Sequence, residues 1–324
     1  MNLPGFPRLL GDVGGTNARF ALQHREGIGH VQVLRCADFA SLQQALRHYL
    51  QGQGVSVRHA ALGIANPVHS DSLRMTNHHW NFSVEQVRAE LGLQDLLVIN
   101  DFAAQALALP VLPDHELQQV GGGRGVPGAA RVVLGAGTGL GVGALLPAGK
   151  GRWQALAGEG GHVSFSPADE QEVDLWRHAR QLHGHVSAER LLSGSGLELI
   201  HRWLGERAGG APARDAAAIT RGALHEGDEL CRQTVRMFCG MLGTLAGNLA
   251  LTLDARAGVY VGGGIVPRIA ELFAASPFRQ RFESKGRFTS TLAEIPVYVI
   301  HSAWPGLLGA GAALQQHLQG LGDA

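Results

Sequence analysis

The sequence predicts an α/β protein with two domains. Its 324 residues are long for a single domain, and short apolar runs typical of strands alternate with stretches of helical period. Both halves also open in the same way, with a strand, a glycine-rich turn and a second strand. Glycine supplies 46 of the 324 residues, about 14% against a usual level of about 7%. The glycines cluster between apolar runs, so they indicate turns rather than low complexity.

Composition excludes several classes of partner. Lys+Arg and Asp+Glu both number 27, so the chain has no basic field that would attract nucleic acid or an anionic membrane, and we expect neither partner. The three cysteines lack CxxC spacing, which indicates a reducing compartment and no structural zinc. No charged and then apolar leader precedes Leu9, so we expect a cytoplasmic protein.

The first half opens at residues 8–22 with a strand, a glycine turn and a second strand. The turn carries an acid (Asp12), two adjacent glycines and a hydroxyl (Thr16). Glycines let backbone N–H groups approach a phosphate, and an aspartate beside them can hold Mg²⁺. A plain hairpin with a Gly-Gly turn has the same pattern and is common, so this turn alone does not decide between the two.

The remaining elements of the first half alternate. A strand at residues 31–34 precedes a helix at 41–51, where apolar residues recur at helical spacing. A strand at 60–65 follows, and a capping-box pattern predicts a helix from Ser83 to about Leu91. These elements and the strand after them form one α/β domain of usual size.

A loop rich in Gly and Pro, residues 121–128, is the natural region for a domain boundary. We assign residues 1–110 to a small α/β domain and residues 111–305 to a large one. A last helix, residues 306–319, is expected to pack back on the small domain and close it.

The strand before this boundary ends in two polar residues. The five residues from Leu96 are apolar or nearly so, which suits a strand buried on both faces. A helix rich in Ala and Leu begins at about Asp101, and Pro110 stops it. Asn100 and Asp101 therefore sit at the carboxyl end of a strand, where open α/β sheets bind ligands. Taken alone, Asp101 is better explained as a helix cap.

The second half repeats this opening at residues 131–146, with Gly137 and Thr138 in the turn. We interpret it as an internal repeat with a second phosphate-binding turn. No Walker A loop is present, because Lys150 is followed by glycine. A GxGxxA match begins at Gly139, but that fingerprint must open a helix and residues 142–146 are predicted as a strand, so we regard it as coincidental.

Four further stretches carry polar or glycine-rich patterns. Glu159 and His162 share a glycine loop that suits a polyol, although such residues are more often only solvated, and Glu189 lies in the first turn of a predicted helix. Residues 228–253 form one long helix whose glycines indicate close packing in the core rather than a membrane span. A triple-glycine turn, residues 262–264, follows a strand and suits a nucleotide.

Taken together and in order, six motifs resemble those of the bacterial glucokinases outside the ROK group. They are Gly11-Asp-Val-Gly-Gly-Thr16, Ile99-Asn-Asp-Phe102, Gly135-Ala-Gly-Thr-Gly-Leu-Gly141, Gly158-Glu-Gly-Gly-His162, Ser187-Ala-Glu-Arg190 and Gly262-Gly-Gly-Ile-Val-Pro267. The resemblance extends from about Leu9 to Leu314, and the CxCGxxGCxE motif of ROK glucokinases is absent. It implies the actin-like, ribonuclease H-like ATPase fold, in which two α/β domains close on an active-site cleft.

The resemblance also implies a function: a glycolytic transferase that phosphorylates glucose at O6 with ATP and Mg²⁺, by in-line transfer, as a homodimer. Asp101 would be the general base and Asp12 the magnesium ligand. The residues implied to hold glucose are Asn100, Asp101, Glu159, His162 and Glu189. The residues implied to hold the nucleotide are Gly11, Asp12, Val13, Gly14, Gly15, Thr16, Gly137, Thr138, Gly262, Gly263 and Gly264.

Two rival classes stay open on the sequence alone. One is a nicotinamide dehydrogenase, which depends on the GxGxxA match. The other is a non-catalytic, sugar-responsive regulator on the same fold, which would carry a DNA-binding segment ahead of Gly11, where only ten residues stand. The choice among glucose, mannose and glucosamine, and the phosphoryl donor, are also left open.

Overall fold

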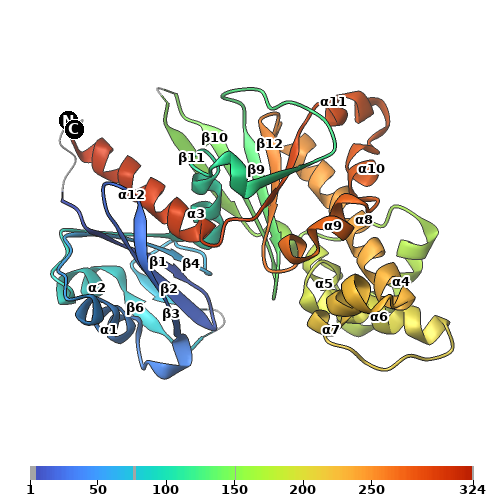
Figure 1. Cartoon of the computed structure of the whole chain (residues 1–324), viewed down its shortest axis with the longest axis horizontal. Coiled ribbons are helices and arrows are strands. Elements are labelled where there is room, and N and C mark those ends of the chain that lie inside the picture. Colours follow the sequence, from blue (N-terminus) through green and yellow to red (C-terminus); the bar gives the residue numbers. More distant parts are fainter. Residues whose placement is uncertain (1–4, 76–77, 150, 323–324) are drawn as a thin grey trace. The chain divides into compact units, whose positions relative to one another are not determined.

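The computed structural model describes residues 5–75, 78–149 and 151–322. Contacts within the chain divide it into two compact units. Unit 1 comprises Met1–Pro113, Pro147–Ala157 and Ser302–Ala324, and unit 2 comprises Asp114–Leu146 and Gly158–His301. The α/β class expected from the sequence is confirmed, because each unit contains both strands and helices (Figure 1).

The sheet of unit 1 has five strands in the order β3-β2-β1-β4-β7. β1, β2 and β3 form an antiparallel meander, whereas β1, β4 and β7 run parallel. The strands are β1 (Arg8–Val13), β2 (Asn17–Gln23), β3 (Ile28–Arg35), β4 (His59–Ile64) and β7 (Asp95–Asn100). A separate small hairpin joins β5 (Ser72–Arg74) to β6 (Asn81–Ser83).

Four α-helices belong to the described part of unit 1: α1 (Leu42–Gln53), α2 (Val84–Glu90), α3 (Asp101–Ala108) and α12 (Pro305–Gly322). The predicted starts of α1 and α2 are confirmed. Ser41 accepts a hydrogen bond from Gln44 N, and Ser83 accepts one from Gln86 N, as N-cap serines do.

Neighbouring strand residues point to opposite faces of this sheet. Leu9 packs in the cluster that contains the buried face of α1, whereas Leu10 packs with Leu307 and Leu314 of α12. α12 also packs along α3. The last helix of the chain therefore supplies part of the core of unit 1.

The second sheet has six strands in the order β11-β10-β9-β12-β13-β8. β9 pairs antiparallel with β10 and parallel with β12, so it holds the position that β1 holds in the first sheet. The strands are β8 (Leu117–Val120), β9 (Arg131–Ala136), β10 (Leu140–Pro147), β11 (Trp153–Gly158), β12 (Gly258–Gly262) and β13 (Val297–Ile300). The predicted internal repeat is confirmed. The GxGxxA match falls on strand β10 and opens no helix, which removes the structural basis of the dehydrogenase interpretation.

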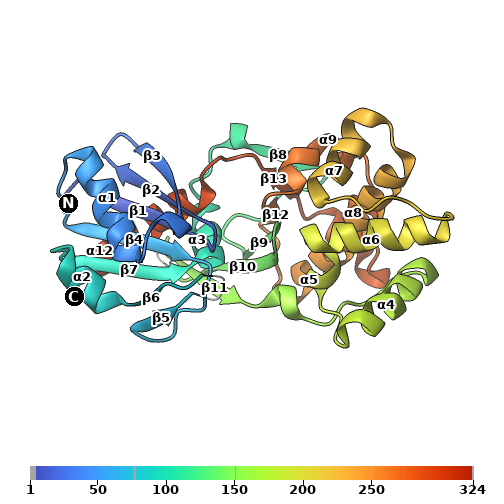
Figure 2. The same ribbon diagram turned by 90° about the horizontal axis from the view of Figure 1, so that it is seen from below.

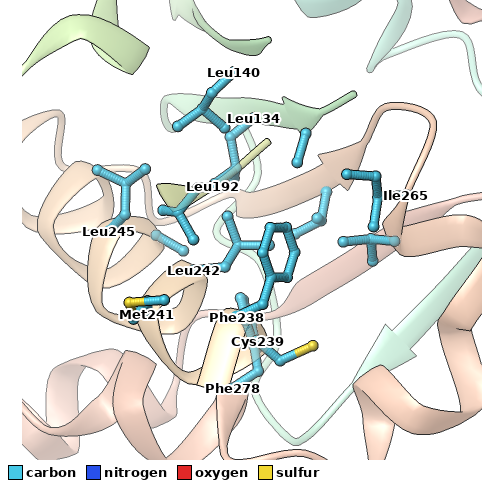
Figure 3. Close-up of a cluster of buried hydrophobic side chains, with 14 of the residues drawn as sticks. Leu134, Leu140, Leu192, Phe238, Cys239, Met241, Leu242, Leu245, Ile265 and Phe278 are labelled. Carbon is cyan, nitrogen blue, oxygen red and sulfur yellow. The ribbon is translucent and has the colours of Figure 1, made fainter. Parts of the chain in front are cut away.

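Helices of unit 2 gather around α8 (Glu229–Thr252), the long helix that the sequence predicts. The others are α4 (Glu170–His183), α5 (Ala188–Leu191), α6 (Gly194–Arg207), α7 (Ala216–Arg221), α9 (Ala270–Ala274), α10 (Phe278–Glu283) and α11 (Thr289–Ala293). Figure 3 shows side chains of α8 such as Phe238 and Leu242 packed with Leu134 of β9 and Ile265. Figure 2 gives a second view of the same elements.

The glycines of α8 have the packing role expected of them. A Cβ at Gly243 would collide with the carbonyl oxygen of Phe278, and one at Gly247 would lie 2.5 Å from the carbonyl oxygen of Phe282. α10 therefore lies directly on the backbone of α8. Among the residues described, no helix combines the length and apolarity that a membrane crossing requires.

Candidate active site

The first glycine turn joins β1 to β2 and is fixed by backbone contacts. Gly14 N donates to Asn17 O at 3.0 Å, which closes the turn. Cys36 braces it from outside, since its N donates to Thr16 O at 2.9 Å and its buried thiol donates to Gly14 O at 3.4 Å. Burial raises the pKa of the Cys36 thiol, so the thiol stays protonated and able to donate. The turn that the sequence singles out is thus a rigid loop.

Asp12 lies just before this turn, and two residues, Arg19 and Gly306, lie against its side chain. Its strand pairs with β2 in a register that sets Asp12 opposite Arg19, and Arg19 Nη1 lies 3.1 Å from Asp12 Oδ2. Gly306, at the start of α12, comes so close that a Cβ there would lie 2.8 Å from Asp12 Cγ. Burial raises the pKa of the Asp12 carboxyl above its ordinary value, and Arg19 partly opposes this rise.

Asn100 and Asp101 divide two tasks at the start of α3. Asn100 is the N-cap, because its Oδ1 accepts from Phe102 N at 2.9 Å and from Ala103 N at 3.1 Å. Asp101 is the first helical residue, and its Oδ1 accepts from Asn100 Nδ2 and from Phe102 N, each at 3.0 Å. The cap that the sequence could have assigned to Asp101 is therefore supplied by its neighbour. The Asp101 carboxylate is held at a helix N-terminus, where negative charge is favoured.

The parallel register brings these two groups to one edge of the sheet. Val13 lies opposite Ile64, and Ile64 lies opposite Asn100. Strands are about 4.8 Å apart, so the glycine turn and Asp101 follow strand ends separated by about 10 Å. Gly63 lies on the strand between them. The backbone at Asp101 passes close to it, because a Cβ at Gly63 would lie 3.7 Å from Asp101 Cα.

The second glycine turn joins β9 to β10 in unit 2 and lies beside the triple-glycine turn. Gly137 N donates to Gly139 O at 2.8 Å, and Gly137 O accepts from Gly194 N at the same distance. Gly263 has a φ of +84°, and a Cβ there would lie 2.7 Å from Ala136 N. Only glycine fits this position, so the backbone after β12 can approach the turn after β9.

Glu189 contacts the second glycine turn directly. Its Oε2 accepts from Leu140 N at 2.8 Å, and a Cβ on Gly139 would lie 2.5 Å from the same oxygen. Glu189 belongs to α5, whose N-cap Ser187 accepts from Arg190 N. The helix start predicted from the sequence therefore places Glu189 against the second glycine turn.

Glu159 precedes a short 3₁₀ turn, Gly160–His162, and His162 is the last residue of that turn, in the same unit. Glu159 Oε2 and His162 Nε2 are 3.9 Å apart, and the two side chains are 64% and 59% exposed. The loop packs on β10, since a Cβ at Gly161 would collide with Leu140 O. Leu140 therefore links this loop to Glu189.

The predicted site residues form two groups. In unit 1 the sheet edge brings residues 11–16 together with Asn100 and Asp101. In unit 2 the turns after β9 and β12 lie near Glu189 of α5 and the loop that carries Glu159 and His162. Within residues 5–75, 78–149 and 151–322, no cluster of three His, Cys, Asp or Glu side chains forms a metal cage. A lone carboxylate such as Asp12 still fits Mg²⁺, which in nucleotide enzymes is bound by one or two carboxylates and by the substrate phosphates.

Two pockets, of about 540 and 590 Å³, lie elsewhere in the molecule. The first lies among α4, α6, α8 and α10, and the second is lined by α1 and the end of α2. Neither contains a predicted site residue, so the chemistry is better located by the strand ends than by these hollows.

Sequence reasoning missed Arg19 and Gly306 as neighbours of Asp12. The sequence contains a signal for Arg19, because a two-strand hairpin around Gly14 and Gly15 sets Asp12 opposite Arg19. The sequence contains no signal for Gly306, since the packing of the last helix brings it to Asp12.

Comparison with known proteins decides the family. The profile of the glucokinase family, described as Glucokinase, matches residues 9–317. The chain belongs to the glucokinase family. A glucokinase of Chromobacterium violaceum is 56% identical over 320 residues, with 97% of this chain and 90% of that protein covered. A glucokinase of Neisseria meningitidis serogroup C is 53% identical over 318 residues, with 97% of each chain covered.

The fold expected from the resemblance is confirmed as well. The crystal structure of a glucokinase from an Antarctic psychrotroph matches with a TM-score of 0.87 at 34% identity, and 97% of this chain and 100% of that chain are covered. Membership of the glucokinase family makes the chain an enzyme and confirms the family assigned from the six motifs.

Proposed function

We propose that this glucokinase-family enzyme transfers the γ-phosphoryl group of ATP to O6 of glucose, with Mg²⁺ as its metal. The observation that carries the proposal is the match to the glucokinase family over residues 9–317. The two glycine turns and the held carboxylate of Asp101 are the parts that phosphoryl transfer to a hydroxyl requires.

Asp101 is proposed as the general base. One of its oxygens is fixed by Asn100 Nδ2 and Phe102 N, so the carboxylate has a set orientation at the sheet edge. In the reaction it would accept the proton of the O6 hydroxyl as that oxygen bonds to phosphorus and the bond to the ADP oxygen breaks. Proton acceptance of this kind typically contributes about 10²–10⁴ in rate.

The glycine turns are proposed to bind the phosphates and nucleoside. Backbone N–H groups of residues 11–16 and of Gly137 and Thr138 would donate to phosphate oxygens, and residues 262–264 would lie against the nucleoside. Asp12 would hold Mg²⁺ directly or through water. When bound, Mg²⁺ neutralises charge on the transferring phosphoryl group.

The sugar is proposed to contact Asn100, Asp101, Glu159, His162 and Glu189. Carboxylates accept hydrogen bonds from hydroxyls, while the amide of Asn100 and the ring of His162 can also donate. A site built on such bonds rejects sugars that lack the matching hydroxyl, by up to about 10⁴–10⁵.

The test is ADP release from MgATP with a panel of hexoses, together with identification of the phosphorylated product. We expect ADP formation to require glucose and the product to be glucose 6-phosphate. ADP release that is indifferent to glucose would contradict the proposal, and glucose binding with no turnover would favour the sugar-responsive regulator. Substitution of ADP or polyphosphate for ATP in the same assay identifies the donor.

A homodimer is part of the proposal, because the family resemblance implies one. Light scattering on the purified chain measures its mass directly. A species at about the 34.2 kDa of one chain would contradict the dimer without affecting the proposed activity.

A further inference from the structure

The start of α12 lies against the carboxylate of Asp12. Gly306 is the second residue of that helix and is buried. A Cβ at this position would lie 2.8 Å from Asp12 Cγ and 3.1 Å from each of its carboxylate oxygens. Real Cβ atoms essentially never approach another heavy atom within 3.0 Å, so any side chain at position 306 must displace something.

Neither backbone can easily move aside, which leaves the Asp12 carboxylate as the part that yields. Asp12 is in the middle of a sheet, paired with Arg19 on one side and with Gly63 on the other, and its short side chain is also held by the Arg19 guanidinium. α12 is fixed by its buried residues Leu307 and Leu314. It is also held at Gly309, where a Cβ would collide with the backbone of Ala104 in α3. The added atom would therefore act mainly on the Asp12 carboxylate.

We propose that Gly306 is a positioning residue that lets the Asp12 carboxylate keep the place from which it serves Mg²⁺. This inference rests on the role proposed above for Asp12. Mg²⁺ requires near-ideal octahedral geometry at about 2.0–2.1 Å. A misplacement of about 1 Å near a reacting group can cost about 10² in rate, and relief of the collision at Gly306 requires a shift approaching that size.

The central variant is Gly306→Ala, with Gly320→Ala as its matched control. Gly320 lies in the same helix, is exposed and has no atom near its Cβ position. For Gly306→Ala we expect kcat to fall about 10- to 100-fold. We also expect a Mg²⁺ requirement raised at least tenfold, and weaker Mn²⁺ binding in the presence of ADP, measured by electron paramagnetic resonance. Glucose affinity by calorimetry should stay at the wild-type value, and Gly320→Ala should match wild type in every measurement.

A structural role and a positioning role give different results. The melting temperature of Gly306→Ala should remain within about 3 °C of wild type, a shift that corresponds to a small change in stability for a protein of this size. Melting more than about 10 °C lower would overturn the positioning role in favour of simple packing. Wild-type turnover and metal requirement in a folded Gly306→Ala protein would overturn it as well.

A double-mutant cycle with Asp12→Ala tests whether Gly306 acts through Asp12. In the Asp12→Ala background the obstructed carboxylate is gone, so Gly306→Ala should change neither turnover nor Mn²⁺ binding further. A second, additive loss would overturn the inference. If Asp12→Ala itself keeps wild-type turnover, the proposed metal role fails and this inference with it. If only Gly306→Ala is silent, the metal role stands and this inference alone is wrong.

Discussion

Asn100 and Asp101 are adjacent residues with separable contributions, one to stability and one to the proposed chemistry. Asp101→Asn keeps the size of the side chain and an oxygen that can accept from Phe102 N. We expect the free energy of unfolding to change by less than about 0.5 kcal/mol, because Asn100 and not Asp101 caps α3. Turnover should fall by about 10²–10⁴ because an amide cannot accept the hydroxyl proton. Steady-state kinetics and chemical denaturation on the same protein measure both.

Asn100→Ala is the complementary variant. It removes the oxygen that accepts from Phe102 N and Ala103 N, and loss of an N-cap typically costs about 0.5–2 kcal/mol. If Asp101→Asn proves nearly fully active, or if Asn100→Ala costs no stability, the division of roles between the two residues is wrong.

Burial raises the pKa of the Asp12 carboxyl, and Arg19 partly opposes that rise. In Arg19→Met the opposing cation is lost, so the pKa of Asp12 rises and the carboxylate is protonated over a wider range of acidic pH. The acid limb of the profile of kcat/KM against pH should therefore move to higher pH, and Arg19→Lys should keep it close to wild type. If the acid limb of Arg19→Met stays at the wild-type pH, Asp12 is not the group whose protonation limits activity.

Contacts between residues near one another in the sequence could be predicted from the sequence, whereas contacts between distant residues could not. The strand-to-helix junction at Asp101 and the serine caps follow from local patterns and are confirmed as structure. The neighbours that fix Asp12 and Glu189 depend on tertiary packing, because Gly306 and Leu140 are far from them in the chain. Local sequence patterns carry no information on such contacts.

At the scale of elements, the contact of α8 with α10 depends on particular glycines. Gly243→Ala must push apart two backbones, because its Cβ would collide with Phe278 O, and overpacking of this kind costs about 1–3 kcal/mol. In Gly240→Ala, in the same helix, the Cβ meets Pro277 Cγ at 3.5 Å and two Arg281 side-chain atoms at 3.8 and 3.9 Å, all ordinary contacts. We expect that control to be neutral, or stabilising by up to about 1 kcal/mol through helix propensity.

Denaturation by urea measures the two α8 variants side by side. Equal stabilities of Gly243→Ala and Gly240→Ala would mean that α10 can shift away from α8 at little cost, against the close contact seen between them.

Elements with a strong apolar period were predictable, and short ones were less so. α1 and α8 follow the helical spacing of their apolar residues. The hairpin of β5 and β6 has three-residue strands, too short for any period to emerge. The triple-glycine turn is followed by a 3₁₀ helix, Val266–Ile269, with Pro267 in its first turn, where the missing N–H would have no intrahelical partner in any case.

At the scale of the whole molecule, glucose binding can be tested with one proposed sugar residue from each unit. Asn100 belongs to unit 1 and Glu189 to unit 2. A ligand that binds only the folded protein stabilises it by about 2.7 kcal/mol at 100 times its Kd. We therefore expect glucose to raise the melting temperature of the wild type, and Asn100→Ala and Glu189→Gln each to reduce that rise.

The comparison must be made as a shift on adding glucose, since Asn100→Ala also loses a helix cap. Gly320→Ala serves again as a control that should keep the full shift. If either site variant responds to glucose as the wild type does, its residue does not hold the sugar.

The fold class was predictable because each half of the chain carries its own strand, turn and strand signal. The composition of each unit was harder to foresee. Unit 1 gathers three separate stretches of chain, and no break in composition marks Pro147–Ala157 as part of it. Segments of this kind join a unit through contacts alone.

The position of α12 has a consequence for synthesis on the ribosome. Leu307, Ala310 and Leu314 cover part of one face of the first sheet, so that part stays uncovered until α12 has been made. Roughly 190 residues separate Pro113 from Pro305, which at about 5–20 residues per second is a delay of about 10–40 s. During this interval the first half of the nascent chain exposes an apolar surface that a chaperone can bind. The residues of unit 2 are synthesised in the same interval, and the stretch Pro147–Ala157 of unit 1 is the longest interruption among them. Unit 2 is therefore positioned to fold first, although its sequence comes second.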